Sequence, residues 1–286
     1  MTNYVAYKSN PSREKVLACY DDTLASWPVK VESRFIETSF GTTHVVISGK
    51  KNGKPLVLLH GAGGNAGMWI HNIAELAKHF RIYAVDIIGE PGKSAGIRPQ
   101  YTSDGHALWL KEIHDILGLE NVALCGISLG SWLACRFALK FPNLVNNLVL
   151  IAPPAILNTD MQFLSRIVWA ALMPTQVVVI GFIKYMSCKA KTLPDSALRS
   201  FVTTWQAYNP NTNMIPSLSR EHICNLPKNT LMILGEDEVM YCSNKAANHI
   251  SCVAENIKVV IIPQAGHIVS YDQPTLVNKE IIKFVG

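Results

Sequence analysis

The 286-residue sequence has little charge, since Asp, Glu, Lys and Arg make up only 16% of it, whereas 49% of its residues are hydrophobic. A chain with so much apolar material can bury a large core, which excludes an intrinsically disordered protein. The 18 glycines and 15 prolines follow no period, which excludes collagen-like and low-complexity proteins. No apolar run of about 18 residues occurs, so we expect no transmembrane segment. The start of the chain has no long apolar core either, which argues against a secretory signal.

Motifs for metals, nucleotides and nucleic acids are missing as well. The seven cysteines form no CxxC pair, and an odd count without metal-ligand spacing predicts reduced thiols in a cytoplasmic protein. The net charge of +5 comes from scattered residues without a basic stripe, so we expect no nucleic-acid partner. Neither GxxxxGKS/T nor GxGxxG is present. We therefore expect no cofactor and no metal, and no pattern predicts an oligomeric state.

Short apolar segments of strand length alternate with helical patterns along most of the chain. Continuous apolar strands interleaved with helices are typical of a parallel sheet that is covered on both faces. The sequence therefore predicts an α/β fold with a mostly parallel central sheet of about eight strands. The expected strands are 34–39, 43–48, 55–59, 81–86, 121–126, 145–151, 230–234 and 257–262. The expected helices between them are 66–79, 104–117, 129–140, 243–253 and 273–285.

Two segments fall outside this alternation. An amphipathic helix is expected at 11–27, ahead of the first strand. Residues 153–227 contain the apolar helical stretches Met161–Leu172 and Val177–Met186 but no strand pattern. We interpret this interval as a helical cap over the strand ends, and a helix lying on a membrane surface is the alternative. The predicted parts are an N-terminal extension at 1–30, a core at 31–152 and 228–286, and a cap at 153–227.

A candidate nucleophile lies where one apolar strand ends and a helix begins, in Gly126-Ile-Ser128-Leu-Gly130. A sharp strand-to-helix turn needs small residues on either side, and it leaves the serine hydroxyl exposed. A serine hydroxyl is a poor nucleophile alone and needs an adjacent base. His267 follows the last strand and is preceded by Gly266, which suits that role. The alternatives are that Ser128 is an unreactive serine in a tight turn and that His267 is a loop histidine with no catalytic role.

An acid is needed to orient the base, and an oxyanion needs backbone N–H donors. Three carboxylates, Glu236, Asp237 and Glu238, follow the strand at 230–234, so the residue pattern identifies the region and leaves the choice open. One oxyanion donor is expected at Leu129, the first residue after the serine. The second is expected in the glycine-rich loop that begins at His60.

These motifs resemble those of the α/β-hydrolase superfamily, over roughly residues 35–286. That family usually places its acid three residues after the glycine that ends its strand, which implies Glu238 here, with Asp237 in reserve. Most relatives have aspartate at that position. The resemblance also implies that Ala62 supplies the second oxyanion amide.

One loop departs from the family pattern. Relatives commonly read Asp-x-x-Gly-x-Gly-x-Ser after the next strand, whereas the segment Asp86–Ser94 carries an extra-looking Glu90-Pro91. The resemblance gives Glu90 no role. Ser128 itself argues against haloalkane dehalogenase or epoxide hydrolase chemistry, because those relatives have aspartate at the elbow.

The favoured function is a serine hydrolase, a carboxylesterase that acts on small to medium, largely apolar esters. Ser128 would attack the carbonyl, His267 would move the proton and Glu238 would orient His267. A lipase, thioesterase, lactonase, C–C hydrolase or perhydrolase is an alternative within the same class, because the fold does not choose between them. The alternative from another class is a ligand-sensing or partner-binding protein with weak turnover.

Overall fold

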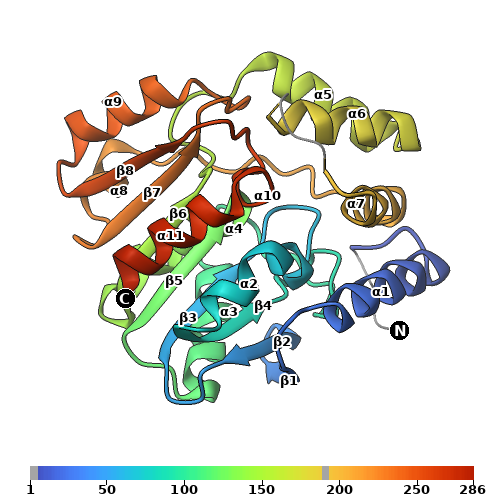
Figure 1. Cartoon of the computed structure of the whole chain (residues 1–286), viewed down its shortest axis with the longest axis horizontal. Coiled ribbons are helices and arrows are strands. Elements are labelled where there is room, and N and C mark those ends of the chain that lie inside the picture. The colour runs from blue at the N-terminus through green and yellow to red at the C-terminus, as the bar shows by residue number, and fades with distance from the viewer. Residues whose placement is uncertain (1–5, 189–192) are drawn as a thin grey trace.

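The computed structural model describes residues 6–188 and 193–286, and within them eight strands form one sheet (Figure 1). The strands lie in the order β1-β2-β4-β3-β5-β6-β7-β8. β2 pairs antiparallel with both β1 and β4, and the remaining neighbours are parallel. The strands are β1 Val31–Thr38, β2 Gly41–Gly49, β3 Lys54–Leu59, β4 Phe80–Val85, β5 Val122–Ile127, β6 Val145–Ile151, β7 Thr230–Gly235 and β8 Ile257–Ile262. The predicted α/β fold with a mostly parallel sheet is confirmed.

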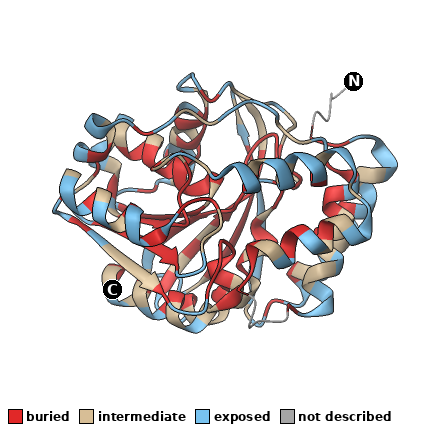
Figure 2. Ribbon diagram, turned by 90° about the horizontal axis from the view of Figure 1, so that it is seen from above, coloured by how far each residue is buried: buried red, intermediate tan, exposed pale blue. Residues whose placement is uncertain are grey.

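Helices cover both faces of this sheet. Helices α3, α4 and α9 contribute buried residues to the core on one face, and α1, α2 and α11 contribute them to the core on the other. The outward sides of the helices are exposed while the strands between them are buried (Figure 2). None of the helices in the described part of the chain has the length and apolar character needed to cross a bilayer. The longer core helices are α1 Asn10–Ala25, α2 Ile70–Leu76, α3 Gly105–Leu117, α4 Leu129–Lys140, α9 Ser243–Val253 and α11 Pro274–Val285.

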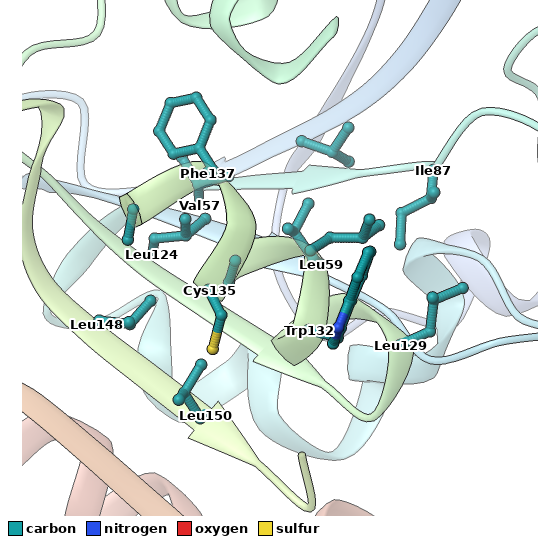
Figure 3. Packing of buried hydrophobic residues seen from close by; sticks show 14 of the residues in the cluster. Val57, Leu59, Ile87, Leu124, Leu129, Trp132, Cys135, Phe137, Leu148 and Leu150 are labelled. Atoms are coloured by element: carbon teal, nitrogen blue, oxygen red, sulfur yellow. The ribbon is translucent and has the colours of Figure 1, made fainter. Parts of the chain in front are cut away.

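The central strands are apolar throughout because both of their faces are buried. In β3, Leu56 and Leu58 belong to one core and Val57 and Leu59 to the other, and all four are at most 1% exposed. This division follows from the alternation of side chains along a strand. On the face that carries Val57 and Leu59, Trp132 and other side chains of α4 pack over strands β3, β5 and β6 (Figure 3). Full burial of one such side chain contributes about 1.5–3 kcal/mol to folding.

The predicted helix over 66–79 is wrong in extent. A 3₁₀ turn, Ala66–Trp69, comes first, and α2 begins only at Ile70 and ends at Leu76. The amides of Lys78 and His79 bond carbonyls three residues back, which tightens the last turn and brings the chain to β4 at Phe80. The other predicted core elements differ from the structure by at most three residues at either end.

Four helices occupy the interval interpreted as a cap (Figure 1). Helices α6 and α7 pack against each other, and the N-terminal helix α1 packs against α7. The segment before α1 also pairs with the end of α7, where Lys8 N–H donates to the Ala207 carbonyl at 3.0 Å and Asn209 N–H donates to the Ala6 carbonyl at 2.9 Å. The N-terminal extension therefore contacts the cap as well as the core. Three of the four helices, α5 Met161–Leu172, α6 Gln176–Met186 and α7 Asp195–Ala207, form the cap. The fourth, α8 Arg220–Cys224, packs against α9 of the core.

Candidate active site

Ser128 lies in a sharp turn between β5 and α4. Its φ of 48° is in the left-handed region, which is strained for a residue other than glycine. A Cβ added at Gly126 would lie 2.2 Å from the Gly130 carbonyl oxygen, and one at Gly130 would lie 2.4 Å from the Leu59 carbonyl oxygen. A 2.9 Å hydrogen bond from Ser128 N–H to the Ile151 carbonyl ties the turn to β6. The two glycines thus permit the backbone contacts that hold Ser128 at the carboxyl edge of the sheet.

His267 lies between Ser128 and Glu238. Its Nε2 is 3.1 Å from Oγ of Ser128, and its Nδ1 is 3.0 Å from both carboxylate oxygens of Glu238. The side chains of His267 and Glu238 are 7% and 0% exposed, so little water competes for these bonds. The amides of Val239 and Met240 each donate to Oε1 of Glu238 at 2.9 Å and fix the carboxylate. Because Nδ1–H of His267 donates to Glu238, Nε2 is left to accept the serine proton.

The two other carboxylates of the acid loop are exposed and do not contact His267 in the described part of the chain. Asp237, the reserve acid, donates its amide to the Ala265 carbonyl at 2.8 Å. Glu236 accepts the amide of Gln264 at 3.1 Å. Both side chains lie at the surface.

The histidines within α3 are core residues. His106 and His114 are 7% and 1% exposed. Burial lowers the pKa of each to about 4, which keeps both rings neutral at physiological pH. Nδ1 of His114 bonds the Leu110 carbonyl at 2.8 Å. Their burial and neutral charge fit a structural role for both residues.

Asp272, a buried carboxylate that the sequence reasoning missed, anchors the loop that carries His267. Its Oδ2 accepts the amides of Gly266 and Cys188, each at 2.8 Å, and its Oδ1 accepts the Ser187 hydroxyl. Ser187 and Cys188 directly follow α6 of the cap. One carboxylate therefore ties the histidine loop to the cap. No local pattern marks this acid, because its partners Ser187 and Cys188 lie 85 and 84 residues away.

The loop after β3 is organised by His60, which is fully buried. Nε2 of His60 accepts the amide of Ile87 at 2.9 Å, so Nδ1 carries the proton and donates to the Gly61 carbonyl at 2.8 Å. Burial lowers the pKa of His60, which keeps the ring neutral. In a trans peptide the C=O and N–H groups point in opposite directions. The bond to Gly61 therefore directs the N–H of Ala62 away from His60.

The two amides expected to bind an oxyanion come from the loop after β3 and from the helix after Ser128. A Cβ added at Gly61 would lie 3.7 Å from Cβ of Ser128, so the loop runs beside the serine. Leu129 is the first residue of α4, and its N–H therefore has no intrahelical partner. The partial positive charge of a helix N-terminus favours an anion there.

A cavity of about 140 Å³ lies above Ser128, between the catalytic edge of the sheet and the cap. Ser128, His267 and Ala62 line it from the core side. Its cap side is largely apolar and includes Phe163, Ile167, Phe182, Met186 and Trp205. A larger cavity of about 340 Å³ lies between α1 and α7 and shares Gly63, Met68 and Phe201 with the first.

Known proteins resemble the chain over nearly its whole length. A sequence model of the family described as alpha/beta hydrolase fold matches residues 54–177. The protein named "Uncharacterized carboxylesterase nap" from Bacillus subtilis (strain 168) is 34% identical, with 93% of this chain and 90% of the relative covered. Carboxylesterase YbfK of the same organism is 32% identical, with 93% and 92% covered. The crystal structure of naproxen esterase (carboxylesterase NP) from Bacillus subtilis superposes with a TM-score of 0.88 at 29% identity, covering 98% of this chain and 100% of that one.

Replacing a glycine with alanine should destabilise the protein at the turn beside Ser128 and stabilise it in the open helix α6. Gly126→Ala should lower the free energy of unfolding by about 1–3 kcal/mol, because its Cβ would overlap backbone atoms that cannot move independently. Gly181→Ala is the matched control in α6, where an added Cβ meets nothing within 4 Å. It should raise the free energy of unfolding by about 0.5–1 kcal/mol, since alanine favours helix. Urea denaturation measures both, and equal stabilities of the two variants would contradict this account of the turn.

Proposed function

This chain belongs to the α/β-hydrolase fold family, and from that premise we propose that it is a carboxylesterase whose catalytic residues are Ser128, His267 and Glu238. The observation that carries the proposal is the pair of hydrogen-bonding distances through which His267 links Ser128 to Glu238. The nearly full-length similarity to proteins named carboxylesterases supports ester hydrolysis in preference to other reactions of the fold.

In the proposed reaction Oγ of Ser128 attacks the ester carbonyl while Nε2 of His267 takes its proton. The tetrahedral oxyanion accepts hydrogen bonds from the amides of Ala62 and Leu129. His267 then gives the proton to the leaving alcohol, which leaves an acyl group on Ser128. Water, deprotonated by His267, attacks this acyl group. The bond from the acyl carbon to Oγ of Ser128 then breaks, His267 returns the proton to Oγ, and the acid is released. Throughout, Glu238 holds the ring and stabilises its charged form.

We assign the acyl group to the smaller cavity above Ser128. Its apolar cap side suits a hydrocarbon chain or ring, and its volume of about 140 Å³ suits small to medium groups. The larger cavity has polar side chains from α1 and α7, among them Asp22, Thr23, Ser200 and Thr204. We assign the alcohol portion of the ester to this cavity. It lies beyond Met68, whose flexible thioether borders both cavities.

We also propose a cytoplasmic location, on the basis of the cysteines. Thiols that stay reduced are typical of cytoplasmic proteins. Free thiols in the structure include those of Cys19, Cys125, Cys135, Cys224, Cys242 and Cys252.

Removal of the nucleophile is the first test. Ser128→Ala should lower kcat on p-nitrophenyl butyrate by a factor on the order of 10⁴ or more, and it should abolish labelling by a fluorophosphonate probe. Ser251→Ala, which changes an exposed serine of α9, should keep both. Full labelling of the Ser128→Ala variant would contradict the proposal. Negligible turnover by the wild type, together with a stable partner captured from its native cell, would favour the ligand-sensing alternative.

The choice of acid is tested by a matched pair of amide substitutions. Glu238→Gln should lower kcat by about 10³–10⁴, because the amide can no longer fix the tautomer of His267 or stabilise its charge. Asp237→Asn, one residue away and exposed, should leave kcat within about twofold of wild type, as surface substitutions generally do. Steady-state kinetics on one ester decides between them, and the reverse ranking would make Asp237 the acid.

The acyl assignment predicts a chain-length preference. Among p-nitrophenyl esters, kcat/KM should peak at about four to six acyl carbons and fall by at least about tenfold at twelve, as the cavity above Ser128 fills. Phe182→Ala enlarges that cavity and should move the peak to longer chains. A profile that Phe182→Ala leaves unchanged would mean that the acyl group lies elsewhere.

A further inference from the structure

Glu90 is a buried carboxylate near the candidate active site that the proposed reaction does not use. Its exposed fraction is only 3%, and it lies in the loop between β4 and α3. Oε2 accepts the amide of Gly63 at 2.6 Å, and the Tyr208 hydroxyl is 3.0 and 2.9 Å from the two carboxylate oxygens. Gly63 belongs to the glycine-rich loop after β3, and Tyr208 ends α7 of the cap and lines the catalytic cavity. Three segments distant in sequence thus meet at one carboxylate.

The loop that carries Glu90 is itself firmly held. The Asp86 carboxylate at its start accepts the Tyr20 hydroxyl at 2.9 Å and the amide of Ala66 at 2.8 Å, and it bonds Nδ1 of His44 at 2.9 Å. Burial raises the pKa of Asp86, but the hydrogen bond from His44, the amide of Lys93 and the electrostatic effect of nearby histidines together outweigh burial and hold the pKa below its ordinary value. Glu90 therefore projects from a fixed support, so its bonds can restrain the partners that it contacts.

The bond to Gly63 fixes the second of the two peptide groups that flank Ala62. His60 holds the first through the Gly61 carbonyl, which directs the Ala62 N–H. Glu90 holds the second through the Gly63 N–H, and Gly63 has a φ of 67° that glycine adopts without strain. With both flanking peptides restrained, rotation of the Ala62 amide is restricted. A hydrogen-bond donor that is already aimed before reaction needs no reorganisation in the transition state.

We propose that Glu90 is a positioning residue for ester hydrolysis: its carboxylate clamps the oxyanion loop to the cap by accepting Gly63 N–H and Tyr208 O–H together. This inference rests on the proposed function, because Ala62 is assigned there as an oxyanion donor. It assigns a role to the Glu90-Pro91 insertion, which departs from the family pattern. It also couples the aim of the Ala62 amide to the position of the cap residue Tyr208.

The charge on Glu90 is set by burial and by a few neighbours. Burial raises the pKa of Glu90 from 4.5 to about 7, against the lowering effects of the hydrogen bonds from Gly63 and Tyr208 and of the charge on Arg98. The Arg98 guanidinium lies 5.5 Å from the centre of the Tyr208 ring and donates to the Gly89 carbonyl at 2.9 Å. Arg98 thus faces the same cluster from the loop that leads to α3.

Asp86, at the start of the same loop, is a second carboxylate of this cluster, and its lowered pKa keeps it ionised. The phenols of the cluster and the facing imidazole of His60 are neutral. Burial, with a smaller effect from the Glu90 charge, raises the pKa of Tyr7, Tyr101 and Tyr208 above the ordinary value for a phenol. Burial lowers the pKa of His60 on the facing loop. The charge of Glu90 consequently changes near neutral pH.

Protonation of Glu90 weakens the clamp. The ionised carboxylate accepts charge-assisted bonds from both donors, and these are roughly twice as strong as bonds between neutral groups. A protonated carboxyl loses that advantage and turns one acceptor into a donor. Protonation has the opposite effect on the stability of the whole protein, because it raises the free energy of unfolding. Because the folded-state pKa is about 7 and the ordinary value is 4.5, the folded protein binds more protons in this interval, and its stability falls as pH rises through it.

The test compares wild type with Glu90→Gln and Glu90→Ala on p-nitrophenyl acetate between about pH 5 and pH 9. Glu90→Gln keeps the shape and a neutral acceptor, so it should lower kcat at pH 8 by about threefold to tenfold, less than the 10²–10³ for a lost donor. Glu90→Ala should lower kcat by about tenfold or more, and KM should change less than about twofold in both variants. The acid limb of the kcat profile should be less steep in both, because one titrating group is gone. In the wild type, ionisation of Glu90 should lower the midpoint of thermal unfolding as the pH rises from about 4.5 to 7. Glu90→Gln should not show this decline.

Tyr7→Phe is the matched control, because the Tyr7 hydroxyl donates to the Gly92 carbonyl of the same loop at 2.9 Å without bonding Glu90. It should keep the kcat and pH profile of wild type. A Glu90→Gln profile that superimposes on wild type would overturn the proposal. Equal losses of kcat in Glu90→Gln and Tyr7→Phe would do so too, since they would indicate general weakening of the loop. Full turnover by Ser128→Ala would instead refute the proposed function, so the two failures are distinguishable.

Discussion

The parallel direction of the central strands is the constraint on which the candidate site depends. Parallel strands end at the same edge of the sheet, so the loops that follow β3, β5, β7 and β8 meet there. These loops carry Ala62, Ser128, Glu238 and His267, which come from four distant parts of the chain. The cores on both faces of the sheet hold the strands in place, so the ends of the loops that follow them are fixed as well. The short distances through His267 are therefore a consequence of topology.

Much of this arrangement could be predicted because its signals are local. Apolar runs of strand length and the glycines at positions 126 and 130 can be read from adjacent residues. The order of serine, acid and histidine follows once each of them is placed after its own strand. The choice of Glu238 needed the family resemblance, since spacing within the acid loop did not distinguish the three carboxylates. In the structure Glu238 is turned inward by the amides of Val239 and Met240, a contact that residue types alone do not encode.

The supporting carboxylates could not be predicted, because their partners are remote. Glu90 bonds Tyr208, 118 residues away, and Asp272 bonds residues near position 187. Each is a buried acid whose position depends on how the cap sits on the core. The partner of the N-terminal helix was unpredictable for the same reason, since α7 belongs to a segment with no strand pattern. The early end of α2 reflects tertiary context: the chain must turn into β4 where the sheet requires it.

Two carboxylates thus connect the cap to the two catalytic loops, Asp272 to the histidine loop and Glu90 to the oxyanion loop. The cap in this account shapes the acyl cavity and also steadies the groups that act on the ester. Support of this kind matters because small displacements of catalytic groups cost large factors in rate.

The central claim, that Ser128 forms an acyl-enzyme with the substrate, is tested most directly by trapping the intermediate. The protein is mixed with a slowly deacylating p-nitrophenyl ester, quenched in acid, and analysed by intact and peptide mass spectrometry. The account predicts one acyl group per chain, located on the peptide that contains Ser128, at the level of the initial burst of p-nitrophenol. An acyl group located on another residue, or a burst without any acyl group at Ser128, would contradict it.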